Sequence, residues 1–384
     1  MKIAHIAPPW IPIPPKNYGG TEVVIYNLIE ELVAQGHDVT LFAPGDAKTS
    51  ARLVSFFPKS LIPSGVPWPA HLKAYYHLHK ALEHAGEFDI VHMHLSTSSD
   101  MYIFPLTAPL QTAHVTTLHS RFPFDRVQNW TGDADSLYME WAPYVPMVAI
   151  SKSAQAEVEH KLNFVGVVYH GLPMDQYRPT GKKREDFFVW LGRVVPDKGV
   201  HLAIEAAKQA NVRIVLAGTI DRHAQESTQY FHQKIEPLID GKQVRYIGPV
   251  NLKEKISLLS RARGFLNPIQ WEEPFGMVMI EAMGVGCPVI SFARGAAPEI
   301  IVHGETGFLV NDLDEMVHYM PRIDEIDRNV TRMHIEKNFS VQAMTKRYIE
   351  IYEKLVKTSK ESALHDTATD EKRTLLSPVR GTAG

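Results

Sequence analysis

Short apolar strand patterns alternate with helical patterns along most of the chain, and this alternation starts twice. The first series opens with Lys2–Ala7 (KIAHIA), a helix from about Thr21 with apolar residues at helical spacing, and Asp38–Ala43 (DVTLFA). A second series opens with Asp186–Leu191 (DFFVWL) and Arg213–Ala217 (RIVLA). Strands that alternate with helices form parallel sheets covered by helices on both faces. The sequence therefore predicts an α/β protein with two Rossmann-like domains.

The two series and a final helix divide the chain into expected units. We expect a first domain over residues 1–168 and a second over residues 169–340. The last helix, residues 341–357, carries an apolar stripe and must therefore dock on another part of the protein. From Thr358 to Gly384 the chain is rich in Ser, Thr, Lys and Glu without periodicity, which predicts a disordered tail over residues 358–384.

Composition and charge exclude several classes of protein. The chain has 40 Lys and Arg against 43 Asp and Glu, a net charge of −3 without the basic excess typical of nucleic-acid-binding proteins. The single cysteine, Cys287, excludes an internal disulfide and a cysteine-based zinc site. Pro8 and Pro9 interrupt the first apolar run, and no run reaches the roughly 20 apolar residues of a membrane span. We therefore expect a cytoplasmic protein, with peripheral contact at the inner face of the membrane left open.

Two glycine-flanked loops are candidates for binding an anion. Gly19 and Gly20 directly precede a helix N-terminus, where a ligand can approach the backbone, although a plain loop–helix junction explains them equally well. Arg193 and Lys198 lie in GRVVPDKG after a strand, which suits a diphosphate but also describes a solvated turn. The chain has neither G-x-G-x-x-G at Gly19 nor a P-loop, which disfavours a dinucleotide dehydrogenase and excludes a P-loop kinase.

The stretch from Trp271 to Gly284 contains two carboxylates on either side of a turn. Glu273 precedes the turn, and Glu281 lies about two helical turns or less from the start of the following helix. Backbone N–H groups at that helix start can bind phosphate, while the carboxylates can accept hydrogen bonds from sugar hydroxyls. A capping acid plus an exposed glutamate is the alternative for either residue alone. The donors expected here are the backbone groups around Phe275, Gly276, Met277 and Val278.

Histidines also lie at strand ends. His119 ends the strand Val115–Leu118, at the edge where open α/β sheets bind ligands. His92 and His94 share one face of another strand and could be metal ligands. Because no matching carboxylate is evident, we interpret these two as structural or supporting residues and predict no metal site.

At GRVVPDKG and EPFGMVMIEAMGVGCPVI the chain resembles the retaining glycosyltransferases of family 4, which have the GT-B fold. The likeness extends to about residue 356, and the usual Asn-Gly at the domain join is replaced by His170-Gly171. Its supporting motifs occur in the expected order: APPW…YGGTE to Glu22, DIVHMH at 89–94, TLHS at 117–120, AISKS at 149–153, VYHGLPMDQYRP at 168–179 and ARGAAPEIIVHGETGFLV at 293–310.

In the second domain the resemblance implies a nucleotide-sugar site. Arg193 and Lys198 would bind the donor diphosphate and neutralise the leaving nucleoside diphosphate. Glu281 would accept hydrogen bonds from the ribose hydroxyls, and Glu273 would hold the transferred sugar with backbone N–H groups of Phe275–Val278.

In the first domain the resemblance implies the acceptor side. Gly19 and Gly20 would let a loop approach the phosphates, and His119 would lie beside the transferred sugar. The final helix would cross back onto this domain, which would face the second across a cleft.

The implied activity is transfer of a hexose, with retained anomeric configuration, from a nucleoside-diphosphate sugar to an unidentified small-molecule, lipid or glycan acceptor. A UDP-sugar is favoured, with GDP- or ADP-sugars open, and neither a metal nor a cofactor is implied. A nucleotide-sugar epimerase and a non-catalytic nucleotide-sugar-binding protein are the alternatives. The acceptor loops match nothing assignable, and we expect the Pro-rich stretches near Pro8–Pro15 and Pro58–Pro69 to select the acceptor.

Overall fold

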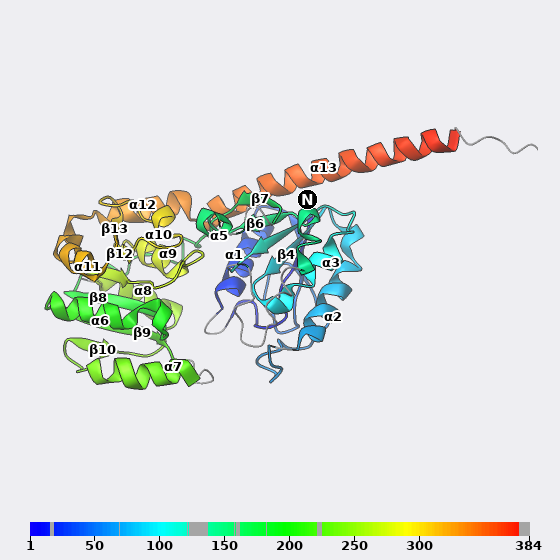
Figure 1. Ribbon diagram of the computed structural model, residues 1–384. Coiled ribbons are helices and arrows are strands. Elements are labelled where there is room, and N and C mark those ends of the chain that lie inside the picture. Colours follow the sequence, from blue (N-terminus) through cyan, green and yellow to red (C-terminus); the bar gives the residue numbers. More distant parts are fainter. Residues whose placement is uncertain are drawn as a thin grey trace, which may run out of the picture.

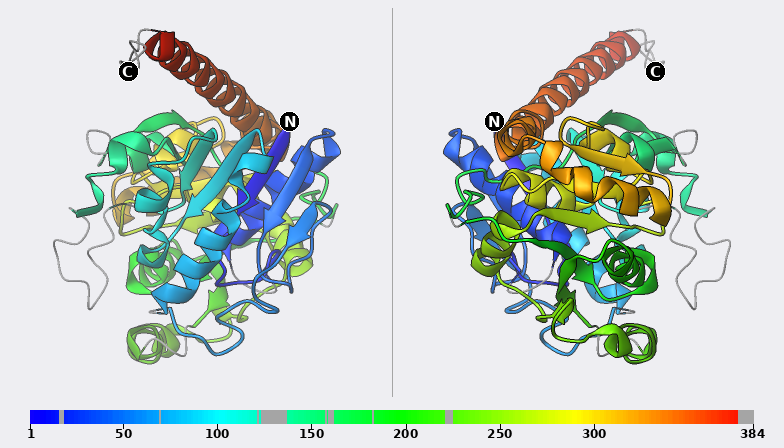
Figure 2. Two further views of the ribbon diagram at one scale, coloured as in Figure 1. Left: turned by 90° about the vertical axis from the view of Figure 1, so that its right-hand side faces the viewer. Right: turned by 90° about the vertical axis from the view of Figure 1, so that its left-hand side faces the viewer.

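The computed structural model describes residues 1–15, 19–68, 70–120, 122, 137–156, 158, 162–181, 183–220 and 225–375, with the backbone alone at 225 and 362–375. These residues form two lobes side by side, and a long C-terminal helix crosses one of them and projects beyond it (Figure 1, Figure 2). Each lobe contains one parallel sheet, which confirms the predicted α/β class. Within the described part of the chain, no helix is both long and apolar enough to cross a bilayer.

The first lobe is built on a seven-stranded parallel sheet in the order β3-β2-β1-β4-β5-β6-β7. Its central strands are buried almost throughout, as expected of a parallel sheet covered on both faces. The sequence analysis did not predict β3 and β7, which are short edge strands. The strands are β1 (Lys2–Ile6), β2 (Asp38–Phe42), β3 (Arg52–Val54), β4 (Ile90–Leu95), β5 (His114–Leu118), β6 (Met147–Ala149) and β7 (Phe164–Val167).

Helices cover both faces of this sheet. The apolar stripe of α1 packs on one face, and α2 packs on the other. The helices of this lobe are α1 (Gly20–Ala34), α2 (His71–Leu82), α3 (Ile103–Thr107) and α5 (Lys152–Ala156), with 3₁₀ turns at Ala85–Glu87, Ser98–Asp100 and Ala142–Tyr144.

The second lobe is built on a six-stranded parallel sheet in the order β10-β9-β8-β11-β12-β13. The order doubles back between β8 and β11, so the carboxyl ends of these neighbours form a topological switch point where α/β sheets bind ligands. The strands are β8 (Phe187–Arg193), β9 (Arg213–Thr219), β10 (Val244–Tyr246), β11 (Gly264–Asn267), β12 (Val289–Phe292) and β13 (Gly307–Val310).

The helices of the second lobe also form two layers. Helices α8, α9, α10 and α12 contribute to the core on one face, and α6 and α11 to the core on the other. A π-helical turn (Phe231–Ile235) and a 3₁₀ turn (Glu236–Leu238) follow α7, so the helical segment that starts at Gln225 is not a regular α-helix throughout. The helices are α6 (Val200–Gln209), α7 (Gln225–Tyr230), α8 (Leu252–Arg261), α9 (Met277–Gly284), α10 (Ala297–Ile300), α11 (Leu313–Tyr319) and α12 (Arg328–Asn338), with 3₁₀ turns at Pro196–Lys198 and Pro321–Glu325.

The last helix, α13 (Val341–Leu375), leaves the second lobe and packs on the first, beside α1 and over β4 and β5. Its Tyr348 and Tyr352 are fully buried there. The prediction of a disordered tail is wrong for residues 358–375, which continue the helix, and residues 376–384 lie outside the described part. Residues 341–377 contain neither glycine nor proline, and extending a formed helix costs far less than nucleating one.

Candidate active site

The loop that carries Arg193 and Lys198 is fixed between β8 and α6. Gly199 ends it with φ +67°, and a Cβ at this position would lie 1.9 Å from the carbonyl oxygen of Pro268. The N–H of Gln270 donates to the carbonyl of Asp197 at 2.8 Å. The loop after β8 therefore packs directly on the loop after β11, and only glycine allows this close approach.

Lys198 and Glu273 meet at this place, although 75 residues separate them. Their side chains form an ion pair, and both are largely buried. The indole N–H of Trp271 donates to Glu273 Oε2 at 3.0 Å, and Lys198 Nζ lies 5.2 Å from the centre of the same indole ring. A carboxylate and an ammonium are thus held side by side at the carboxyl ends of neighbouring strands.

A third loop, which follows β12, contacts the backbone of Glu273. The N–H of Ala296 donates to the Glu273 carbonyl at 2.9 Å, and Gly295 has φ +57°. A Cβ on Gly295 would lie 2.3 Å from that carbonyl oxygen. The segment ARGAAPE, residues 293–299, therefore holds the backbone of Glu273 in place. The sequence alone did not indicate this role.

Glu281 lies on α9 in a separate polar cluster. It is buried, forms an ion pair with Lys255 of α8, and accepts a hydrogen bond of 2.9 Å from the Tyr177 hydroxyl. Burial, followed by the Glu281 carboxylate, raises the pKa of Tyr177 well above its ordinary value. Neither partner was predicted from the sequence. Tyr177 belongs to a quoted motif, but nothing in the sequence distinguishes Lys255 from other helical lysines.

The turn between the two glutamates sets the start of α9. Gly276 is its N-cap with φ +86°, a conformation that favours glycine, and Met277 and Val278 form the first turn. Phe275 is buried and packs its ring 4.8 Å from that of His170, at the join between the lobes. The N-terminus of α9 thus lies between the carboxylates, as the sequence analysis expected.

On the first lobe, Gly19 and Gly20 lead directly into α1. A Cβ on Gly19 would lie 2.6 Å from Glu22 Oε2, whereas one on Gly20 would meet nothing within 4 Å. Glu22 is buried, and burial, with a smaller effect of the Asp100 carboxylate, raises its pKa to about 7. Tyr18 of the YGGTE motif lies outside the described residues. Close packing therefore explains a glycine at 19 but not at 20.

His119 follows β5 and stands next to other imidazoles. Its Nε2 lies 2.9 Å from Nδ1 of His94, and its ring stacks on that of His170 at 5.4 Å. Burial lowers the pKa of His119 and His94 well below the ordinary value and that of His170 to about 3. Because of these lowered pKa values, the three histidines are neutral at physiological pH. The ring contacts of His170 with His119 and Phe275 also connect His119 with the turn that follows Glu273.

Direct hydrogen bonds hold the two lobes together beside this turn. The Ser151 hydroxyl donates to the Pro274 carbonyl at 2.6 Å. The Glu299 carboxylate accepts from the backbone N–H groups of Lys152 and Ser153 and from the Tyr169 hydroxyl, each at 2.8 Å. The AISKS segment is thus an interdomain contact, a role that the sequence analysis did not predict.

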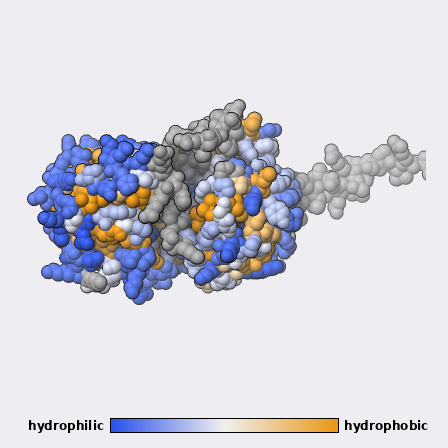
Figure 3. Space-filling model, turned by 90° about the horizontal axis from the view of Figure 1, so that it is seen from below, coloured by the Kyte–Doolittle hydropathy of each residue, from blue (hydrophilic) through white to orange (hydrophobic). Residues whose placement is uncertain are grey.

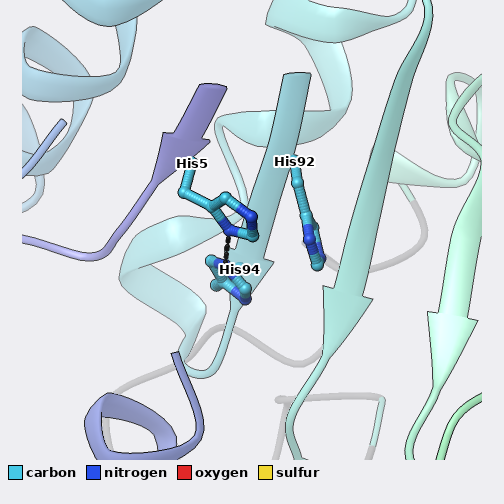
Figure 4. A group of neighbouring side chains, drawn as sticks. All are labelled: His5, His92 and His94. Carbon is cyan, nitrogen blue, oxygen red and sulfur yellow. Dashed lines mark hydrogen bonds between the residues drawn. The ribbon is translucent and has the colours of Figure 1, made fainter. Parts of the chain in front are cut away.

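The structure places the predicted residues in three groups. Lys198 and Glu273 are in contact, Glu281 pairs with Lys255 and Tyr177, and His119 reaches the second lobe through His170. Arg193 ends β8, is exposed and has an interaction partner of its own. Among the described residues, the cluster with metal-ligating geometry is His5, His92 and His94 (Figure 4). It lies in the first lobe, whereas the loops of Lys198 and Glu273 belong to the second.

Two facing parallel-sheet lobes, a crossing C-terminal helix and polar loops at the strand ends define a glycosyltransferase of the GT-B type. The family model described as Glycosyltransferase Family 4 matches residues 18–176, and that described as Glycosyl transferases group 1 matches residues 175–338. The chain therefore belongs to the family 4 glycosyltransferases of the GT-B fold, as the motifs implied.

Relatives of known sequence and structure agree with this assignment. The chain is 24% identical to spore coat protein SA of Bacillus subtilis, over 92% of this chain and all of that protein. It is 24% identical to a D-inositol 3-phosphate glycosyltransferase of Corynebacterium efficiens, over 87% of this chain and 90% of that one. The crystal structure of AviGT4, a glycosyltransferase involved in avilamycin A biosynthesis, is 25% identical with a TM-score of 0.68, covering 93% of this chain and 98% of that one. HepE of Anabaena in complex with UDP-glucose has the same fold, with 18% identity, a TM-score of 0.66, and coverage of 92% and 100%.

Proposed function

We propose that the protein transfers a hexose from a UDP-sugar to a hydroxyl of an acceptor, with retention of the anomeric configuration. The observation that carries this proposal is the Lys198–Glu273 contact at the ends of neighbouring strands β8 and β11. One group can hold a diphosphate and the other a sugar hydroxyl, so the pair suits a ligand in which phosphate and sugar are adjacent. The complex of HepE with UDP-glucose supports a UDP-sugar as donor.

Each side chain then has a defined task. Lys198 exchanges its carboxylate partner for the donor diphosphate, and Arg193 adds a second positive charge at the end of β8. Glu273 accepts hydrogen bonds from the sugar, with backbone N–H groups near Met277 and Val278. Glu281, preorganised by two partners, accepts from the ribose. These positive charges and the α9 N-terminus stabilise the charge that develops on the leaving group, without requiring a metal.

The proposed reaction is a same-face displacement. The bond between the anomeric carbon and the β-phosphate oxygen breaks, and the acceptor oxygen bonds to that carbon on the same face. The departing diphosphate takes the acceptor proton, so UDP leaves and the configuration is retained. Glu273 is held by the indole N–H of Trp271, which supports a positioning role rather than that of a nucleophile.

We place the acceptor on the first domain, residues 1–168 with α13, and the donor on the second, residues 169–340. A small pocket lies at the carboxyl ends of β1 and β4, lined by residues that include Pro8, Pro9, Leu78, His94 and Asp100. Its walls are mostly apolar, with one carboxylate. This mixture supports an acceptor that presents a hydroxyl on an otherwise weakly polar body.

The surface beside this pocket supports an amphiphilic acceptor and peripheral contact of a cytoplasmic enzyme with a membrane. Trp68, Leu72 and Tyr76 are exposed at 43%, 77% and 48% on or next to α2, where Lys73 also lies. On the face shown in Figure 3, hydrophobic side chains form small patches on a mainly hydrophilic surface. We expect Leu72→Ser to reduce co-sedimentation with anionic vesicles and Met333→Ser, at a 57% exposed site on the other lobe, to leave it unchanged. Equal sedimentation of both variants would contradict this surface.

The test of the activity is a donor screen with purified protein. UDP-, GDP- and ADP-hexoses are incubated with candidate acceptors, and the released nucleoside diphosphate and the glycosylated product are both measured. Lys198→Ala and Glu273→Ala should lower turnover by at least about 100-fold, since each removes a charged group from the reacting centre. Lys253→Ala, which removes an exposed lysine from α8, is the matched control. Wild-type turnover in both site variants would refute the assignment.

The same assay separates the alternative functions. A sugar changed without acceptor would indicate an epimerase, and donor binding without any turnover would indicate a binding protein.

A further inference from the structure

Three imidazoles, two of them fully buried, form a hydrogen-bonded row in the first lobe that ends at His119. His5 on β1 and His94 on β4 join through Nδ1 and Nε2 at 3.3 Å (Figure 4). His94 Nδ1 in turn lies 2.9 Å from His119 Nε2. His5 and His94 are 0% and 2% exposed, whereas His119 is only partly buried. Both ring nitrogens of His94 are therefore used by other histidines, and His119 is the most exposed ring of the row.

The row leaves one nitrogen unpartnered at each end. Among the described residues, His5 Nε2 and His119 Nδ1 are buried atoms without a hydrogen-bond partner. A buried polar atom without a partner costs about 1–3 kcal/mol, so each such atom requires an explanation, for example a bound water or a ligand that completes it. His170 Nδ1, on the ring stacked on His119, is another such atom. The His5 end lies inside the sheet. The His119 end adjoins His170, and through it the turn after Glu273.

The same histidines do not form a ready metal site. His92 uses both ring nitrogens with hydroxyls, Nδ1 with Tyr352 at 2.6 Å and Nε2 with Thr117 at 2.7 Å. A metal would have to break both bonds and enter beneath α13. His92 therefore anchors α13, and only His5 and His94 remain to act on His119.

A neutral imidazole has one N–H and one acceptor nitrogen, so the protons of the row are correlated. Either every histidine donates toward His119, whose Nδ1 then carries a proton, or every one donates toward His5, and Nδ1 is then an acceptor. In both arrangements Nε2 of His119 is occupied by His94. Burial keeps the three rings neutral, because it lowers the pKa of each one.

We propose that His94, held in turn by His5, is a positioning residue that fixes the ring of His119 and reserves its Nδ1 for the transferred sugar. This inference rests on the proposed function, since it assumes that His119 faces the sugar. In this role His94 acts on the sugar through His119, although its ring also forms part of the pocket wall assigned to the acceptor. By occupying Nε2 of His119, His94 leaves Nδ1 to face the sugar, and the direction of the His94–His119 hydrogen bond determines whether that Nδ1 carries a proton.

Two amide substitutions at one position test the proposal. Asn places its amide near the position of Nδ1, so His94→Asn keeps the bond to His119 and loses that to His5. Gln places its amide near Nε2, so His94→Gln keeps the bond to His5 and loses that to His119. Both amides alter the pocket wall in a similar way, so the two variants are compared with each other, and we expect kcat of His94→Gln to be at least about tenfold below that of His94→Asn. UDP affinity and the donor KM should stay within about twofold in both variants.

A spectroscopic measurement keeps the test independent of activity. The ¹⁵N shifts of the His119 ring, assigned by comparison with His119→Ala, should show one neutral tautomer in the wild type and in His94→Asn, and a mixture in His94→Gln. A tautomer mixture in the wild type, or equal kcat in the two amide variants, overturns the proposal. Wild-type turnover in His119→Ala would instead refute the role of His119 in the proposed function. With no turnover of any donor by the wild type, the ¹⁵N result alone decides.

Discussion

His170 at the domain join makes stability depend on pH, and replacing it by asparagine isolates the effect. Its ring is 5% exposed and is packed between His119 and Phe275, with centre distances of 5.4 and 4.8 Å. The family motif usually has asparagine at this position, so His170→Asn introduces a residue that the local backbone accommodates. The substitution removes one titrating group from the buried histidine row and its surroundings.

The magnitude follows from the shift in pKa. Burial lowers the pKa of His170 from 6.5 to about 3. Between these values the unfolded chain binds a proton that the folded chain excludes, so the free energy of unfolding falls as the pH falls through this range. From about pH 8 to about pH 5 the loss from this one residue amounts to about 2 kcal/mol. His170→Asn should lack this part of the loss.

Urea unfolding of the wild type and His170→Asn at both pH values provides the test. Lost ring packing lowers stability at both pH values and largely cancels in the difference between them. His232→Asn, at an exposed surface position, controls for removing a histidine as such. We expect the pH-dependent loss to be about 2 kcal/mol smaller in His170→Asn than in the wild type. Equal losses in these two proteins would mean that burial does not hold His170 neutral.

Three further substitutions test the supports of the site. Gly199→Ala should lower the free energy of unfolding, measured in urea, by more than about 1 kcal/mol. Gly199 has a positive φ, and a Cβ there would lie 1.9 Å from the carbonyl oxygen of Pro268. A smaller effect would contradict the loop packing. Glu299→Gln should speed hydrogen exchange of the backbone N–H groups at the start of α5 by about tenfold, because it weakens their charge-assisted bonds to the other lobe. Unchanged exchange would argue against this contact. Tyr177→Phe should weaken UDP binding by about threefold to tenfold in calorimetry, as Glu281 loses one of its partners, whereas undiminished affinity would exclude a role of this hydroxyl.

The second-lobe site could be anticipated from sequence because its determinants are local. Gly199 requires a left-handed turn after a strand, and Glu273 and Glu281 flank a helix start. The order of the strands, which was not predicted, places β8 beside β11 and so brings Lys198 to Glu273. Local turn chemistry therefore identified the loops, and the sheet topology brought them together.

The supporting residues could not be found in the same way. Glu299 acts on backbone N–H groups 146 and 147 residues away in the other lobe, and Tyr177 reaches Glu281 across 104 residues. Such contacts depend on how the lobes and helices pack, which no local pattern encodes. The length of α13 was missed for another reason. Residues 358–375 lack an apolar stripe, which favours disorder by composition, but a helix already nucleated continues through polar residues.

The buried tyrosines of α13 have a consequence for the order in which the protein is made. Tyr352 and Tyr348 bond to His92 and Thr117, which precede them by 260 and 231 residues. A chain emerging from the ribosome therefore completes every strand of its second sheet while the first still lacks its covering helix. Until that helix arrives, the apolar groove beside α1 and the polar groups of His92 and Thr117 are open to water. The lobe synthesised first is thus the last to be finished, and nascent chains that end before Val341 should depend most on chaperones.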